Sequence, residues 1–192
     1  MPVEEIARRV AASAGAEARI DIAFGDRTVD VPVTHWPAAL TTARDEGCTY
    51  FDWLSAVDEL DAGFAVVACV WRLGTPAQAL LLRTRLGREE HLPSATGVYA
   101  GADWHEREVH EMFGIAVDGH PNLVPLLLPE GFEGHPLRKD FVLASRVAKP
   151  WPGAKEPGES NADVGGGGRA TARRKNLPPG VPDPATWGPR RP

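Results

Sequence analysis

Two apolar runs of strand length, separated by a short turn, constrain the fold of this 192-residue chain more than any other feature. Residues 64–71 and 78–86 are rich in β-branched and bulky side chains, and Leu73-Gly74-Thr75-Pro76 lies between them. β-Branched and aromatic side chains favour strands, whereas Gly and Pro together mark turns. The sequence therefore predicts two strands joined by this turn.

The remaining periodic segments predict the rest of an α+β domain. Polar and apolar residues alternate on either side of a Gly-Asp pair, which predicts a β-hairpin. Helical spacing predicts two helices, and one further segment does not decide between helix and strand. These segments are 19–24 and 28–33 for the hairpin, 2–15 and 36–46 for the helices, and 50–60 for the undecided one. We expect a small, mostly antiparallel sheet with flanking helices on one face, followed by an extended C-terminal arm.

A third helix is predicted over residues 103–113. Asp103 is a favourable N-cap residue, and Glu106 follows three positions later, which is the capping-box pattern. Arg107 stands four positions before Glu111, so the two side chains are placed to form an ion pair on one side of the helix.

The composition divides the chain into a body, residues 1–144, and an arm, residues 145–192. The arm holds nine of the 18 prolines and a run of four glycines. The body carries 12 Lys and Arg against 22 Asp and Glu, a net charge of −10, and the arm carries 9 against 4, a net charge of +5. An acidic body does not suit nucleic-acid binding. Trp151 and Trp187 are predicted to anchor the arm on a partner, and a free disordered tail is the alternative.

Sequence motifs argue against several kinds of catalytic or metal site. His105 and His110 are five residues apart, whereas the zinc-protease helix needs two His four apart. At about 100° per residue they point roughly 140° apart, so a shared metal is not expected. Cys48 and Cys69 are too far apart for a C-x-x-C motif, an iron–sulfur site or a zinc site. We expect no metal or cofactor to be bound by this chain.

Membrane insertion and secretion are not predicted either. No apolar run reaches the ~20 residues that span a bilayer. The first 18 residues contain charged side chains and no continuous apolar stretch, unlike a signal peptide. The chain is therefore expected in the cytosol, with any membrane association made through partners.

The helix at 103–113 and the segments after it are dense in carboxylates and imidazoles. Such groups perform acid–base chemistry when they converge, so a free-standing metal-dependent hydrolase is one interpretation. Alternating charges on a helix are more typical of a solvated face or an interface held by ion pairs. We favour the interface, because no nucleotide loop or nucleophile motif accompanies the cluster.

Five segments together resemble one known family. They read FDWLSAVD at 51–58, GADWHEREVHEMFGI at 101–115, GHPNL at 119–123, LLLP at 126–129 and GHPLRKDF at 134–141. In this order they strongly resemble the signature of the 30 kDa subunit of respiratory complex I. Two departures are mild: His110 replaces the usual Tyr or Phe, and Val124-Pro125 replaces a common Arg pair.

The resemblance implies a structural subunit in the peripheral arm of a proton-translocating NADH:quinone oxidoreductase. Such a subunit carries no flavin, iron–sulfur cluster or quinone chemistry of its own. It packs against the large quinone-site subunit and its cluster-bearing neighbours, and its C-terminal arm extends over them. A place on the cytoplasmic side of a bacterial plasma membrane follows, with ubiquinone and menaquinone both left open. A homologous subunit of a membrane-bound hydrogenase or a deazaflavin dehydrogenase is the alternative.

The resemblance also assigns the residues expected to meet partner subunits. Most are charged or aromatic, and the charged ones are expected to form interfacial ion pairs, in which loss of one group strands the other. The candidates are Trp104, Glu106, Arg107, Glu108, Phe113, His120, His135, Arg138, Lys139, Asp140, Trp151 and Trp187. No catalytic residue is expected among them.

Overall fold

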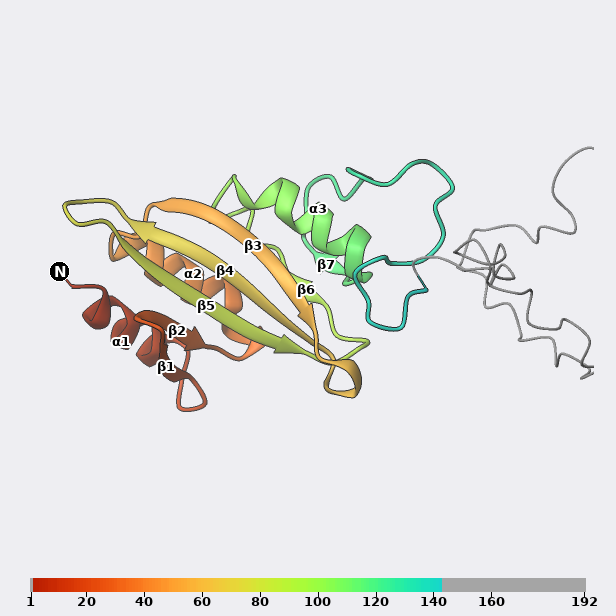
Figure 1. Ribbon diagram of the computed structural model, residues 1–192. Helices are drawn as coiled ribbons and strands as arrows, with labels where there is room; N and C mark the ends of the chain where they lie inside the picture. The colour runs from red at the N-terminus through yellow and green to blue at the C-terminus, as the bar shows by residue number, and fades with distance from the viewer. Residues whose placement is uncertain (1, 143–192) are drawn as a thin grey trace, which may run out of the picture. The chain divides into compact units, whose positions relative to one another are not determined.

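A computed structural model describes residues 2–142 and is built around one five-stranded sheet (Figure 1). The strand order is β1-β2-β5-β4-β3, and only the β2–β5 pair is parallel. The strands are β1 (Arg19–Ala23), β2 (Asp26–Asp30), β3 (Tyr50–Asp58), β4 (Phe64–Arg72) and β5 (Gln78–Leu86). The prediction of a mostly antiparallel sheet is therefore confirmed.

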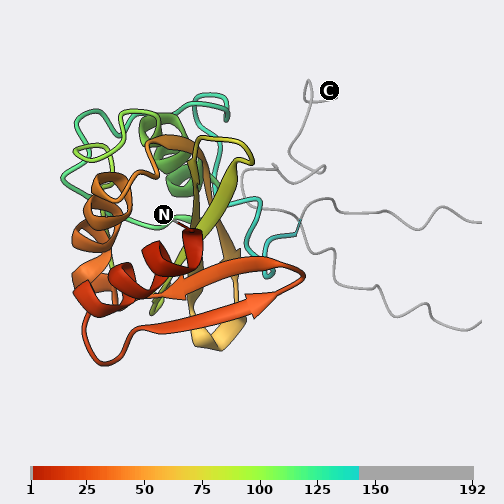
Figure 2. The same ribbon diagram turned by 90° about the vertical axis from the view of Figure 1, so that its left-hand side faces the viewer.

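The helices cover one face of this sheet (Figure 2). They are α1 (Val3–Ser13), α2 (Trp36–Asp45) and α3 (Ala102–Phe113), with short 3-10 turns η1 (Val33–His35) and η2 (Leu60–Ala62). Two short strands, β6 (Leu92–Pro93) and β7 (Val117–Asp118), form a small parallel pair. The predicted α+β class with flanking helices is confirmed. Among residues 2–142, no helix is both long and apolar enough to cross a bilayer.

The core follows from the period of two along the strands. Alternate β4 side chains, Phe64, Val66, Ala68 and Val70, are almost fully buried under the helices. Apolar residues of all three helices complete the same core, among them Ile6, Val10, Trp36, Leu40, Val109 and Phe113. This packing fixes α3 against the body of the domain.

The segment that the sequence left undecided forms strand β3 at the edge of the sheet. Its pairing with β4 shifts between Phe51 and Trp53, so Asp52 is an extra residue in a β-bulge. The bulge interrupts the polar–apolar alternation, which is why the periodicity did not identify a strand. Beyond the bulge the burial pattern alternates residue by residue.

The end of α3 matches its prediction, but its start does not. Gly114 ends the helix in a left-handed conformation, φ 70°, and its N–H bonds to the His110 carbonyl. The N-cap is Gly101 and no side chain caps the helix, so the prediction of an Asp103 capping box is wrong. The predicted arm, with Trp151 and Trp187, lies outside the described residues.

Candidate functional site

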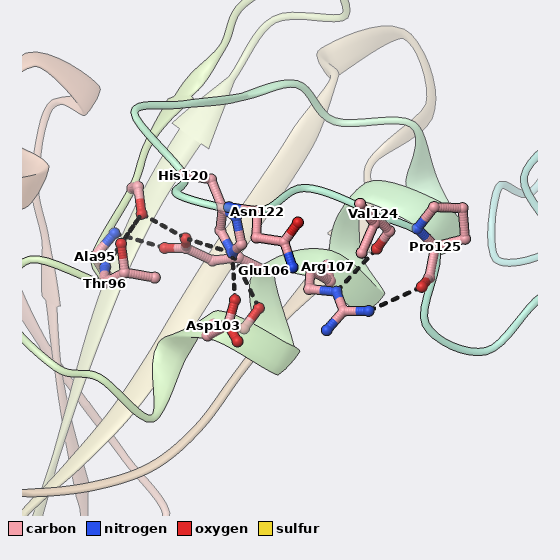
Figure 3. Close-up of polar contacts among 10 residues, drawn as sticks. Ala95, Thr96, Asp103, Glu106, Arg107, His120, Asn122, Val124 and Pro125 are labelled. Carbon is pink, nitrogen blue, oxygen red and sulfur yellow. Dashed lines mark hydrogen bonds and ion pairs between the residues drawn. The ribbon is translucent and has the colours of Figure 1, made fainter.

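Several polar side chains of α3 bind to other parts of the chain, and Glu106 is the clearest case (Figure 3). Its side chain is fully buried. One carboxylate oxygen accepts the Ala95 N–H at 2.5 Å, and the other accepts the Ser94 hydroxyl at 2.7 Å. Burial raises the pKa of this carboxyl, and the two hydrogen bonds offset only part of that rise. Glu106 therefore fastens α3 to the loop after β6.

His120 is buried beside the same helix. The Asn122 N–H donates to its Nδ1 at 3.0 Å, so the proton of the neutral imidazole resides on Nε2. Nε2 lies 3.2 Å from the Asp103 carbonyl oxygen and 3.0 Å from Asp103 Oδ1. Asp103 lies inside the first turn of α3 with its carboxylate facing this imidazole, so it does not occupy the N-cap position. The residues that follow β7 are thereby fixed to the first turn of the helix.

Arg107 also turns toward its own chain. Its Nε donates to the Val124 carbonyl and its Nη2 to the Pro125 carbonyl, both at 2.8 Å. The two parallel bonds use the fork geometry of the guanidinium. The predicted ion pair between Arg107 and Glu111 is absent among residues 2–142, since both side chains bind the backbone of the following segment instead.

Glu111 accepts hydrogen bonds from consecutive backbone N–H groups. Leu127 donates at 2.8 Å and Leu128 at 3.3 Å. Burial acts to raise the pKa of Glu111, but these donors and the nearby Arg107 outweigh it and lower the pKa. The imidazole of His135 adds a bond from Nδ1 to the Glu111 carbonyl at 2.8 Å. The carboxylate therefore orders a stretch of chain that has no regular secondary structure.

Asp58, at the end of β3, secures the last described residues. Its buried carboxylate accepts the Lys139 N–H at 2.8 Å, the Leu60 N–H at 2.9 Å and Arg88 Nη2 at 2.7 Å. Burial favours a higher pKa, but these three donors prevail and hold the pKa of Asp58 below its usual value. Asp58 thus joins the sheet to a segment some eighty residues later in the chain.

Arg138 occupies the neighbouring position. Its Nε donates to the Phe113 carbonyl at the end of α3. Its guanidinium carbon lies 5.6 Å from the centre of the Phe64 ring, and that of Arg88 lies 4.7 Å from the same ring. Both cations therefore contact one aromatic side chain of β4.

These contacts make one continuous unit from α3 and residues 119–140. Backbone groups of residues 124, 125, 127, 128 and 137 bond to α3, the N–H of residue 122 bonds to the His120 side chain, and the N–H of residue 139 bonds to Asp58. Among residues 2–142, no three His, Cys, Asp or Glu side chains are grouped to hold a metal ion. Burial raises the pKa of the Cys48 and Cys69 thiols to about 11.

Comparison with known families bears on this unit directly, because α3 and residues 119–140 lie inside the matched region. Residues 29–147 match the family described as "Respiratory-chain NADH dehydrogenase, 30 Kd subunit". The chain belongs to this family. The resemblance found in its motifs is therefore confirmed.

Relatives with curated names are similar to two thirds of the chain, and they are named as subunits of an NADH-quinone oxidoreductase. The relative from Mesorhizobium japonicum is 38% identical over 133 residues, and that from Brucella abortus is 40% identical over 134 residues. In both cases the alignment covers 66% of this chain and 65% of the relative. The chain therefore matches somewhat less than two thirds of the length of these relatives.

Two solved structures share the fold. A trypsin-resistant fragment of Nqo5 superposes with a TM-score of 0.56 at 24% identity, covering 64% of this chain and all of the fragment. A chain of the membrane-bound sulfane sulfur reductase, an archaeal respiratory membrane complex, superposes with a TM-score of 0.64 at 21% identity. That match covers 73% of this chain and 86% of the other. At these identities the likeness concerns the fold alone.

Several residues that the sequence predicted at a subunit interface instead make contacts within this chain. Glu106 and the His120 side chain are fully buried, and Phe113 belongs to the core, so none of these side chains is available to a partner. Arg107, His135 and Arg138 bond to backbone carbonyls of the chain itself. Trp104, Lys139 and Asp140 are exposed and Glu108 is partly exposed, so their interface assignment stays a prediction.

Sequence reasoning gave no such role to Asp58 or Glu111. Asp58 stands at the end of the quoted FDWLSAVD segment, and Glu111 stands inside the α3 motif. For Asp58 a signal was present, because it continues the alternation of the buried residues Leu54 and Ala56 along β3. Their bonding partners lie 81 and 16 residues away, and such pairs cannot be chosen from one sequence.

Glu111→Gln tests the electrostatic part of this unit. Because the folded pKa of Glu111 is lowered, its stabilisation is present above the unfolded value of 4.5 and is lost as pH falls through the folded pKa. At neutral pH we expect the free energy of unfolding of the variant to be about 1–2 kcal/mol lower than that of the wild type. Urea unfolding measured from neutral pH into the acid range should show this gap narrowing below pH 4.5.

Glu108→Gln is the matched control, since Glu108 lies on the same helix without an ion-pair partner among residues 2–142. Its unfolding curve should stay within about 0.5 kcal/mol of the wild type at every pH. A gap for Glu111→Gln that is independent of pH would show that the ionised carboxylate does not order the segment.

Proposed function

We propose that this chain is a structural subunit of the peripheral arm of a proton-translocating NADH:quinone oxidoreductase. Family membership over residues 29–147 supports this, as do the relatives named as subunits of an NADH-quinone oxidoreductase. In this proposal flavin, iron–sulfur clusters and quinone are carried by partner subunits, chiefly the large quinone-site subunit and its cluster-bearing neighbours. The chain sits on the cytoplasmic side of a bacterial plasma membrane and reaches the membrane through those partners.

One observation carries the proposal physically. In the unit of α3 and residues 119–140, the side chains of Glu106, Arg107 and Glu111 bind to the chain itself, whereas large apolar side chains remain outside. Trp104 is 66% exposed, Leu127 57% and Leu137 50%. We call these three residues, with the exposed Val124, the docking surface. Large apolar side chains held on an ordered backbone suit burial against another protein.

The role of such a surface in electron transfer is mechanical. Electrons pass between centres at separations that must stay constant, and a subunit packed against its partners limits their relative motion. The internal hydrogen bonds order residues 119–140 before binding, so docking loses less conformational entropy than docking of a free loop. The chain then contributes stiffness and exclusion of water, and its partners contribute the chemistry.

A related membrane complex is the second candidate. The chain of the membrane-bound sulfane sulfur reductase has the same fold at a TM-score of 0.64, so the fold alone does not separate the two. Identification of the captured partners separates them: nucleotide- and flavin-binding subunits indicate the NADH enzyme, and their absence beside a hydrogenase-type or reductase-type subunit indicates the alternative.

Capture from native membranes tests the docking surface. The tagged full chain should retain peripheral-arm subunits in mild detergent, and Leu127→Asp with Leu137→Asp should reduce their recovery about tenfold or more. Burying one Leu contributes about 1.5–3 kcal/mol, and a buried carboxylate adds a further cost. Recovery is measured by quantitative mass spectrometry of the captured subunits.

Leu73→Asp is the matched control, because Leu73 is 61% exposed in the β4–β5 turn, outside the docking surface. It should capture partners as the wild type does. Equal recovery by all three proteins would exclude the proposed surface, and capture of no respiratory subunit by the wild type would exclude the function.

A further inference from the structure

The segments that carry the docking surface also carry several carboxylates. Carboxylates of Glu108, Glu130, Glu133 and Asp140 lie on α3 and the segment that follows. Within residues 2–142, none of the four has an Arg, Lys or His nitrogen within ion-pair distance. Four negative groups on α3 and the segment that follows it are thus without a neutralising neighbour in the described part of the chain.

The arginines of the same region bind to backbone carbonyls and do not pair with these carboxylates. Arg107 donates to the Val124 and Pro125 carbonyls, and Arg138 donates to the Phe113 carbonyl while it contacts the Phe64 ring. Lys139 remains as the exposed cation between residues 101 and 142. Because both guanidinium groups bind to backbone carbonyls, carboxylates outnumber cations among the exposed side chains of the unit.

A pocket beside α3 combines the two properties of this surface. It has a volume of about 280 Å³, and its lining includes the apolar Leu123, Leu128 and Pro129, the acidic Glu111 and Glu130, and the imidazoles of His110 and His135. Arg and Lys side chains have an aliphatic stem and a charged head, so they match a pocket with apolar walls and an acidic rim.

We infer that the partner of the docking surface is a protein face whose apolar centre is ringed by Arg or Lys side chains, one of which enters this pocket. The inference rests on the proposed function and specifies the partner's chemistry. Charge complementarity supports it: an acidic rim attracts basic groups and disfavours acidic ones. Apolar contact supplies most of the affinity, and the charges set orientation and association rate.

Rebinding to depleted membranes tests the inference with the full chain. Membranes from a strain that lacks this chain receive purified protein, and the dissociation constant is measured at low and high KCl. For Glu130→Lys with Glu133→Lys we expect a dissociation constant about tenfold higher at low salt, and a smaller difference at high salt.

The matched control is Glu17→Lys with Asp61→Lys, which changes the net charge equally at exposed carboxylates outside the surface. It should bind within about twofold of the wild type. If the rim and control variants bind alike while Leu127→Asp with Leu137→Asp still abolishes binding, the basic partner face is excluded and the proposed function stands. If the leucine variant also binds normally, the docking surface itself is excluded.

The basic residues 145–192 are the other source of positive charge. A synthetic peptide of this sequence, added in trans to the wild-type chain, should bind the rim far more weakly than the membranes do. Binding of the peptide that equals membrane binding and is lost in Glu130→Lys with Glu133→Lys would overturn the inference in favour of the chain's own arm.

Discussion

Replacement of Asp58 by Ala is expected to lower the free energy of unfolding by about 3 kcal/mol. The buried carboxylate accepts two backbone N–H groups, from Leu60 and Lys139, and pairs with Arg88. Its removal leaves those donors without an acceptor and strands a guanidinium beside the Phe64 ring. Urea unfolding of the purified full chain, followed by tryptophan fluorescence, measures the loss.

The consequence for residues 138–142 distinguishes this explanation from a general loss of stability. Amide exchange at Lys139 should become much faster in Asp58→Ala under conditions where the sheet remains folded, because the amide has lost its acceptor. Asp61→Ala, three residues away at an exposed position, should change the unfolding free energy by less than about 0.5 kcal/mol. Equal effects at the two positions would contradict the assigned role of Asp58.

Gly114→Ala is expected to lower the free energy of unfolding by a similar amount, about 3 kcal/mol. Gly114 ends α3 at φ +70°, where any other residue is strained. A Cβ there would also lie 2.5 Å from His135 Nε2 and 2.6 Å from Arg138 Nη2. Both side chains must move, and each now bonds to the end of α3. Thermal and urea unfolding should both register the loss.

Gly131→Ala separates the two causes. Gly131 has φ +77°, but a Cβ built there meets nothing within 4 Å. It should therefore cost only the conformational strain, about 1 kcal/mol. The excess at Gly114 measures the close approach of His135 and Arg138. Equal losses at both glycines would show that this close approach does not matter to stability.

Periodicity and turn chemistry predicted most of the fold. The two apolar runs became β4 and β5, the Gly-Asp hairpin became β1 and β2, and each predicted helix is present within two residues of its expected bounds. These features depend on neighbours in sequence, so the sequence alone contains them. Strand β3 was left undecided because the extra residue Asp52 breaks its alternation.

The sequence predicted which segments form the candidate site, but not which contacts their side chains make. The motifs pointed to α3 and residues 119–141, and the structure brings these segments together. The direction of their polar side chains could not be predicted, because it depends on distant backbone. Glu106 bonds to residues 94 and 95, and Arg107 to residues 124 and 125. Charged residues expected at an interface therefore order the chain itself, and the exposed leucines take their place in the proposed contact.

The contacts of Arg107 change the reason why Arg107→Ala is expected to reduce assembly. A change to Ala removes two bonds to the segment that carries the docking surface, so its effect on a partner passes through the order of that segment. Reduced assembly then follows even though Arg107 contacts no other subunit. The apolar substitutions act on the contact directly, and comparison of the two separates order from contact.

The most direct test of the central claim measures assembly and turnover in the same membranes. In the native organism, Leu127→Asp with Leu137→Asp should reduce assembled enzyme about tenfold, quantified on native gels, whereas Leu73→Asp should not. We expect NADH:quinone turnover per assembled enzyme to be unchanged in the variant. Full assembly with lost turnover would contradict it and would assign this surface a direct part in electron or proton transfer.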